Sequence, residues 1–166
     1  MNATADYVIR YVYPAAAALL PEPMDRVEAW RMLTAIGLQE SRFTHRAQVR
    51  GPARGFWQFE RAGGVAGVLE HVSTRRAAEG ACAVLGYPAT AAAVYTAIED
   101  NDVLAACFAR LLLWTSPRSL PRDAGQGVDG WTQYLATWRP GKPHPQTWAG
   151  YYAAAWATDW PGTVRA

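Results

Sequence analysis

The chain has 166 residues, of which 51% are hydrophobic and 18% are charged, and its formal net charge at pH 7 is +2. This length and composition indicate one globular domain, residues 1–166, and exclude a disordered chain. The small net charge gives no indication of a nucleic-acid partner, and no apolar run is long enough for stable membrane insertion.

The first twenty residues predict a helix rather than a signal peptide. They have no basic start, and Arg10 interrupts the apolar run. Thr4 or Asp6 is the expected N-cap. If the substrate lies outside the cytoplasm, another component must therefore deliver the protein. The side chains of this helix that we expect in the core are Val8, Tyr11 and Val12.

A second helix is predicted from Asp25, as N-cap with Glu28 as its capping-box partner, to Glu40. Its apolar face, marked by Leu33 and Ile36, ends in Glu40 instead of another apolar residue. A glutamate is rarely buried unless it is paired or functional, and burial raises its pKa toward the range that a general acid needs. The alternative interpretation is a salt bridge from Glu40 to one of three nearby residues, Arg42, Arg46 or Arg54.

Residues 42–64 lack a helical period and are rich in Gly, Arg and aromatic residues. They predict a long loop or a very short β-ribbon. Flat aromatic side chains pack against the apolar faces of sugar rings, although they also fill protein cores. A carboxylate at a helix end, next to a glycine-rich aromatic turn, therefore favours a sugar-cleaving site.

Most of the remaining chain shows helical periodicity. Residues 102–114 are apolar almost all round, with Arg110 as the only charge inside, which predicts a buried central helix. Cys82 and Cys107 continue apolar helical faces and are expected to be buried free thiols, with a disulfide between them left open. Residues 116–130 are predicted to be a loop. Further helices are predicted at residues 65–71, from Ser73 or Thr74 to Gly86, from Thr90 through Ile98, and at about residues 131–138 and 146–157.

The predicted fold class is mostly α, with helices around one buried central helix and a small irregular or short β-ribbon lobe next to Glu40. No spacing of His, Cys, Asp or Glu is typical of a metal site, so neither a metal nor a cofactor is expected.

Two motifs carry a resemblance to a known family. Glu40-Ser41 at a helix end, followed by the turn at residues 55–58 (Gly-Phe-Trp-Gln), resembles the Glu-Ser and Gly-Leu-Met-Gln motifs of the lysozyme-like lytic transglycosylases. Goose-type lysozymes and phage endolysins belong to the same superfamily. The resemblance is best over residues 30–64, and residues 101–113 resemble the family's asparagine-led central helix. It implies a lysozyme-like fold.

A third motif departs from the family. Residues 134–141 lie where the family has Ala-Tyr-Asn-x-Gly, and Trp138 and Arg139 replace the Tyr-Asn pair. Tyr134 is the candidate to substitute for the missing tyrosine.

The resemblance implies that Glu40 is the general acid that protonates the glycosidic oxygen between N-acetylmuramic acid and N-acetylglucosamine. Ser41 would orient Glu40 or a sugar, and Gln58 would hydrogen-bond an acetamido group. Backbone capping is an equally good interpretation of Ser41 and Gln58, and core packing of Trp57. The other residues expected to contact the substrate are Phe56, Trp57, Tyr134, Trp138 and Arg139.

The type of reaction depends on a second carboxylate. Glycosidases use two carboxylates at about 5–9.5 Å, and Glu60 is the nearest candidate, on the same side of an extended segment as Gln58. An exposed partner for Arg54 or Arg61 is the alternative role of Glu60. Without a base for water, the muramyl 6-hydroxyl attacks internally and gives a 1,6-anhydro sugar, as in lytic transglycosylases. The motifs favour this second route.

Three classes of function remain: cleavage of peptidoglycan, non-catalytic glycan binding, and a structural role in a phage particle. The first is favoured, with peptidoglycan glycan strands as partner, to which the mild positive charge is suited. A short chain of this kind fits a phage or prophage endolysin that is made in the cytoplasm and released by a pore-forming holin. A wall-penetrating enzyme carried in the virion fits equally well. A monomer is expected.

Overall fold

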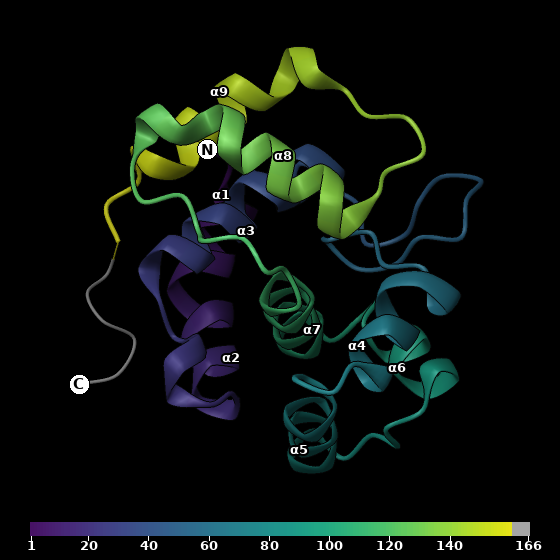
Figure 1. Ribbon diagram of the computed structural model, residues 1–166. Helices are drawn as coiled ribbons and strands as arrows, with labels where there is room; N and C mark the ends of the chain where they lie inside the picture. The colour runs from purple at the N-terminus through teal and green to yellow at the C-terminus, as the bar shows by residue number, and fades with distance from the viewer. Residues whose placement is uncertain (161–166) are drawn as a thin grey trace.

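The predicted central helix is present as α7, Asp102–Trp114. The computed structural model describes residues 1–160 and is mostly α-helical, with the other helices arranged around α7 (Figure 1). Each residue from 104 to 113 is buried. The helix starts at Asn101, whose side chain accepts a hydrogen bond from the backbone N–H of Leu104 at 2.9 Å. An apolar helix without a polar face has to lie in the core, as the sequence predicted.

The other helices follow the predicted order. They are α1 (Ala3–Tyr7), α2 (Tyr13–Leu19), α3 (Val27–Glu40), α4 (Ala66–Glu70), α5 (Arg75–Leu85), α6 (Ala91–Ala97), α8 (Gly127–Trp138) and α9 (Pro145–Trp156). Helix α9 packs along α3 and against α8, and π-helical turns at Val8–Val12 and Arg61–Val65 lead into α2 and α4.

Helix α8 starts earlier than predicted, because residues 127–130 are helical and not part of a loop. Two glycines in this first turn suggested a loop. They serve packing instead: a Cβ on Gly130 would lie 2.7 Å from the ring of Tyr152 in α9. Glycine is required here because α9 approaches closely.

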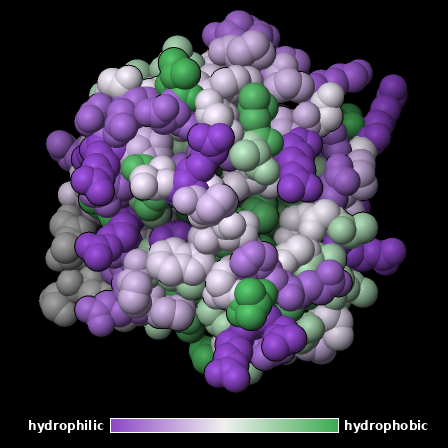
Figure 2. All heavy atoms as spheres, viewed as in Figure 1, coloured by the Kyte–Doolittle hydropathy of each residue, from purple (hydrophilic) through white to green (hydrophobic). Residues whose placement is uncertain are grey.

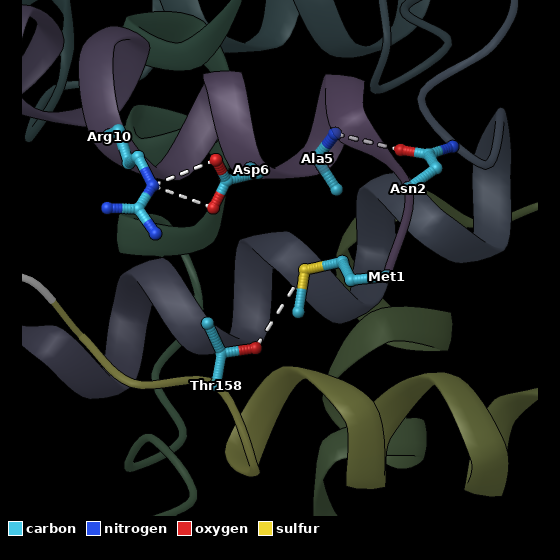
Figure 3. Close-up of polar contacts among 6 residues, drawn as sticks. All are labelled: Met1, Asn2, Ala5, Asp6, Arg10 and Thr158. Carbon is cyan, nitrogen blue, oxygen red and sulfur yellow. Dashed lines mark hydrogen bonds and ion pairs between the residues drawn. The ribbon is translucent and has the colours of Figure 1, made fainter.

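The N-terminal helix differs from the prediction in its cap and in its buried face. Asn2, not Thr4 or Asp6, caps it by accepting a hydrogen bond from Ala5 N–H at 2.8 Å, and Asp6 pairs with Arg10 (Figure 3). Ile9 is buried with Val8 and Val12, whereas Tyr11 is 66% exposed. The reason is the π-helical turn, which changes the register of the face that follows.

The start of α3 also differs from the prediction. The N-cap position is Arg26, and its side chain makes no capping hydrogen bond. Asp25 does not form a capping box with Glu28, because its carboxylate accepts a hydrogen bond from the indole N–H of Trp30 at 2.8 Å. Asp25 therefore accepts a hydrogen bond from the Trp30 side chain instead of from a backbone N–H of α3.

Residues 42–60 form the irregular lobe. It has no continuous strand, only isolated antiparallel bridges that pair Arg54 with Ala47 and with Phe59. Two ion pairs hold the lobe: Arg46 makes a bidentate contact with Asp102 at the start of α7, and Arg54 pairs with Glu99 at 2.8 Å. The lobe is thereby fastened to the helical part at two places.

Cys82 and Cys107 are both buried and free, so the disulfide alternative is wrong. Burial raises the pKa of the Cys107 thiol to about 12.

Among residues 1–160, no helix is both long and apolar enough to cross a membrane. On the face drawn in Figure 2, hydrophilic side chains predominate and hydrophobic ones form small separate groups.

Candidate functional site

A cleft of about 1230 Å³ opens at the end of α3. Its walls come from the irregular lobe, α4, the segment after α7, α8 and the loop at residues 139–144. Six of the residues that the sequence indicated line this cleft: Glu40, Gln58, Glu60, Tyr134, Trp138 and Arg139. They come from three separate stretches of the chain, which the fold brings to one place.

Glu40 is the last residue of α3 and is partly buried in the cleft wall. Its Oε1 accepts a hydrogen bond from the hydroxyl of Tyr134 at 2.7 Å. Burial raises the pKa of Glu40 to about 7, against the opposing effect of the hydrogen bond from Tyr134. A carboxyl group with this pKa is able both to donate and to accept a proton near neutral pH.

The predicted alternative, a salt bridge from Glu40, is wrong. Arg46 is paired with Asp102, and Arg54 is paired with Glu99. Within the described part of the chain, Glu40 forms no ion pair, with Arg42 or with any other residue. Its pKa is therefore governed by burial and by Tyr134.

Tyr134 is held in place by aromatic rings from α8 and α9. Its ring stacks on Trp148 with a centroid distance of 5.3 Å and an interplanar angle of 11°, and Trp131 lies 5.2 Å away. Burial and the neighbouring Glu40 both raise the pKa of Tyr134, so its hydroxyl stays protonated and donates to the carboxylate. The aromatic packing therefore fixes the position of the Tyr134 hydroxyl next to Glu40.

Left-handed backbone occurs at non-glycine residues on three sides of the site. Arg42 and Phe43 follow Glu40 with φ of 56° and 53°, and Gln58 and Arg139 both have φ of 49°. Each such residue costs on the order of 1–3 kcal/mol and persists only where the surrounding structure enforces it. These sharp turns end α3 and α8 at the cleft and bring the lobe back toward them. Backbone strain of this kind clusters at functional sites.

The turn at residues 55–58 depends on its glycine. Gly55 has φ of 71°, and a Cβ there would lie 2.7 Å from the carbonyl oxygen of Ile98. The side chain of Gln58 folds back, and its Nε2 donates to the carbonyl of Gly55 at 2.9 Å. The capping interpretation of Gln58 is therefore correct for its nitrogen, while the residue also lines the cleft.

Ser41, Phe56 and Trp57 do not line the cleft, so the prediction that they contact the substrate is wrong. The alternative interpretations, backbone capping for Ser41 and core packing for Trp57, are correct. The Ser41 hydroxyl is buried and donates to the carbonyl of Phe56 at 2.7 Å. Phe56 is 1% exposed and Trp57 is fully buried, with its indole N–H donating to the carbonyl of Leu33 at 2.9 Å. The rings and hydrogen bonds of these three side chains are buried in the core, and they hold the turn against the end of α3.

Trp138 connects the two walls of the cleft. Its indole N–H donates to the carbonyl of Trp57 at 3.0 Å, which ties the end of α8 to the lobe. Arg139, the next residue, is exposed and has the left-handed backbone that ends the helix. Glu60 is also exposed on the cleft lining. Trp138 is thus a structural link, whereas Arg139 and Glu60 are accessible to a ligand.

Sequence reasoning missed several polar residues of the cleft. Gln39, directly before Glu40, donates to the carbonyl of His144 at 3.0 Å and accepts from the Thr147 hydroxyl at 3.0 Å. This amide fastens the loop after α8 to α3. In the sequence, only its position next to Glu40 indicated that Gln39 belongs to the cleft. Further polar lining residues that belong to none of the motifs include Gln48, Glu70, His71, Thr115 and His144.

Comparisons with protein-family models, with curated proteins and with solved structures find no match to this chain.

Proposed function

We propose that this chain cleaves the glycan strand of bacterial peptidoglycan at the bond between N-acetylmuramic acid and N-acetylglucosamine. The observation that carries the proposal is Glu40, which stands in a large open cleft with a pKa raised to about 7 by burial. A cleft of about 1230 Å³ exceeds the usual size of small-molecule pockets, roughly 300–1,000 Å³, as a polymer substrate requires.

In the proposed reaction, protonated Glu40 donates its proton to the glycosidic oxygen while the bond from that oxygen to C1 of the muramyl ring breaks. The muramyl 6-hydroxyl then attacks C1, and the Glu40 carboxylate accepts the hydroxyl proton. The products are a free sugar hydroxyl and a 1,6-anhydro-muramyl end, and no water is consumed. This reaction is the one expected of the lytic transglycosylases, whose Glu-Ser and Gly-x-x-Gln motifs this chain resembles.

Two further contacts support this proposal. The hydrogen bond from Tyr134 to Glu40 supports Tyr134 as the substitute for the tyrosine of the family's third motif. Gln58 lines the cleft and uses its nitrogen within the turn, so its carbonyl oxygen is the group to receive an acetamido N–H. Arg139 is exposed beside them and would meet the lactyl or peptide carboxylates of the wall.

A hydrolytic reaction is the second candidate, and the position of Glu60 favours it. Glu60 is an exposed carboxylate on the lining of the same cleft, and it forms no ion pair among the described residues, so its predicted pairing with Arg54 or Arg61 is wrong. In this alternative it activates a water molecule on the other side of the sugar.

The test is mass spectrometry of the muropeptides that are released from purified peptidoglycan. The parent is expected to release anhydro-muramyl products, Glu40→Gln none, and a matched control on the exposed face of α5, Glu79→Gln, the same products as the parent. Reducing-end muramic acid from the parent would assign a hydrolase. Equal digestion by Glu40→Gln would refute the role of Glu40, and no products from the parent would favour glycan binding or a structural role.

The biological setting follows from the same proposal. An enzyme of this kind acts on the cell wall as a phage or prophage endolysin released by a pore-forming holin, or as a wall-penetrating component of a phage particle. Lysis on co-expression with a holin, but not without one, is the expected result for an endolysin.

A further inference from the structure

A second, smaller cavity of about 310 Å³ adjoins the cleft, with which it shares the lining residues Ser116 and Arg118. It is formed by the chain before α3, the C-terminal end of α7, the segment that leads from α7 to α8, and α8 itself; in Figure 1 this segment is the thin green trace between the two helices. Its apolar wall consists of Pro23, Leu113, Trp114 and Leu120. Its polar wall consists of Arg26, Arg110, Ser116, Arg118 and Gln133.

The charge of this cavity is one-sided. Three arginines line it, and the described lining residues include no carboxylate. Within residues 1–160, none of these arginines belongs to an ion pair. Arg26 and Arg118 are exposed at the mouth, whereas Arg110 is 1% exposed at the inner wall. Such an arrangement attracts an anion and leads it inward.

Arg110 is an incompletely paired buried cation. Its Nε donates to the carbonyl of Met24 at 2.7 Å, and its guanidinium lies 5.1 Å from the ring centre of Trp114. Its Nη2 is buried and has no hydrogen-bond partner among the described residues. Burial lowers the pKa of Arg110 to about 10, so the guanidinium stays charged at neutral pH. The negative charge of Asp25 opposes this shift, so the charge of Arg110 is partly compensated within the protein, and Nη2 is the buried donor that still lacks an acceptor.

Gln133 presents a second unpaired group to the same cavity. It lies on α8 and is 1% exposed. Both Nε2 and Oε1 are buried and have no hydrogen-bond partner in the described part of the chain. Buried amides are normally paired on both atoms. A ligand that satisfies Gln133 must therefore offer one hydrogen-bond acceptor and one donor.

We propose that this cavity binds a small carboxylic acid that also carries an amide, such as an N-acylated amino acid or the last residue of a peptide. The carboxylate would accept a hydrogen bond from Nη2 of Arg110, because Nε already donates to the carbonyl of Met24. The ligand amide would pair with Gln133, and a short apolar side chain would lie against Leu113 and Trp114. This site uses neither Glu40 nor Tyr134, so it does not rest on the proposed function.

Nuclear magnetic resonance tests the proposal on the full chain, with N-acetyl-L-alanine as the probe. The side-chain amide signals of Gln133 and the Nε–H signal of Arg110 are expected to shift at millimolar probe concentrations. N-acetyl-L-alanine amide has the same shape without the charge and is expected to bind at least about tenfold more weakly. Absence of any shift in the parent, or equal binding of the neutral amide, would overturn the proposal.

Three variants assign the binding to this cavity. Arg110→Met removes the charge with similar volume, Gln133→Leu removes the amide, and Arg118→Gln removes a charge from the exposed mouth, where folding is not at risk. Each is expected to weaken binding of the probe, the first two by about tenfold or more. The matched control is Arg75→Gln on the exposed surface of α5. Unchanged binding in all three variants would refute the site, and inorganic phosphate that binds as tightly as the probe would refute the role of Gln133.

Two sources of the ligand are separated by a longer probe, N-acetyl-alanyl-alanine. Binding of the dipeptide at least as tight as that of the single acid would identify a peptide end. Binding of the single acid alone would identify a free metabolite, and either result supports the site. The titration is repeated with Glu40→Gln, which is expected to bind the probes unchanged, so a failure of the proposed cleavage activity does not affect this test.

Discussion

The hydroxyl of Tyr134 donates a hydrogen bond of 2.7 Å to Oε1 of Glu40, across 94 positions of sequence. This bond favours the charged carboxylate, whereas burial of Glu40 favours the neutral acid. Burial has the larger effect, and the pKa of Glu40 therefore rises to about 7. The stability of the protein, its pH dependence and the proposed catalysis therefore depend on the same two side chains.

The raised pKa of Glu40 predicts how stability changes with pH. Between the ordinary pKa of 4.5 and about 7, the folded protein binds more protons at this site than the unfolded chain does. The free energy of unfolding therefore falls as pH rises through this range. Glu40→Gln has no proton to lose, so its stability relative to the parent is expected to be greater at about pH 8 than at about pH 4 in denaturant titrations. A difference that does not change with pH would contradict burial as the cause.

Tyr134→Phe is expected to move the pH profile of cleavage. If protonated Glu40 is the acid, kcat/KM falls above a pH near 7. Loss of the hydrogen bond from Tyr134 raises the pKa of Glu40 further, so the alkaline limb should move upward by about 0.4–1 pH unit. Tyr152→Phe is the control from the same aromatic cluster, because its hydroxyl donates to the carbonyl of Asp123 instead. A profile that is scaled down without a shift would contradict the positioning role of Tyr134.

Glu60→Gln separates the two reaction types. In the lytic transglycosylase reaction Glu60 has no chemical step, and the variant is expected to keep its rate within about threefold, because uncharged exposed substitutions cost little. In a hydrolytic reaction the loss of the base lowers kcat by about 100-fold or more. Initial rates on purified peptidoglycan, together with the identity of the released muramyl end, decide between them.

Gly55→Ala is expected to destabilise the protein more than the same change at another glycine with positive φ. At Gly55 the left-handed backbone costs about 1–2 kcal/mol for alanine, and the added Cβ also meets the carbonyl of Ile98 at 2.7 Å. Gly86 has φ of 79° and open space around an added Cβ. Gly86→Ala therefore loses only the unfolding free energy that the left-handed backbone costs an alanine. Equal losses of unfolding free energy in the two variants would refute the steric role of Gly55.

Ser41→Ala is expected to lower stability without changing substrate affinity. The hydroxyl connects the carbonyl of Phe56 and the N–H of Phe43 inside the protein, and unpairing them costs about 1–3 kcal/mol. Because Ser41 lies outside the cleft lining, KM should match that of the control Ser119→Ala on the surface. A raised KM with unchanged stability would instead indicate that Ser41 contacts the substrate.

Periodicity predicted the helical part of the fold because burial along a helix is encoded by neighbouring residues. Helix α7 and the position of Glu40 at the end of the apolar face of α3 could both be found in this way. The ends of helices were less predictable. Asp25 prefers the indole of Trp30 to a backbone cap, and the glycines that begin α8 accommodate Tyr152.

The irregular lobe shows what local sequence could not predict. For Trp57 the sequence left the choice between the cleft and the core open, and the residue is buried against α3 because the lobe folds back onto the helices.

A mostly helical chain with a buried central helix and a carboxylate at the end of α3 could be predicted from local sequence, because these features depend on contacts between neighbouring turns. Long-range packing was needed to show that Tyr134 reaches Glu40, that Ser41, Phe56 and Trp57 lie in the core, and that Arg110 and Gln133 share a cavity. Each of these facts joins segments that are remote in sequence, where burial and charge depend on packing and leave no local pattern.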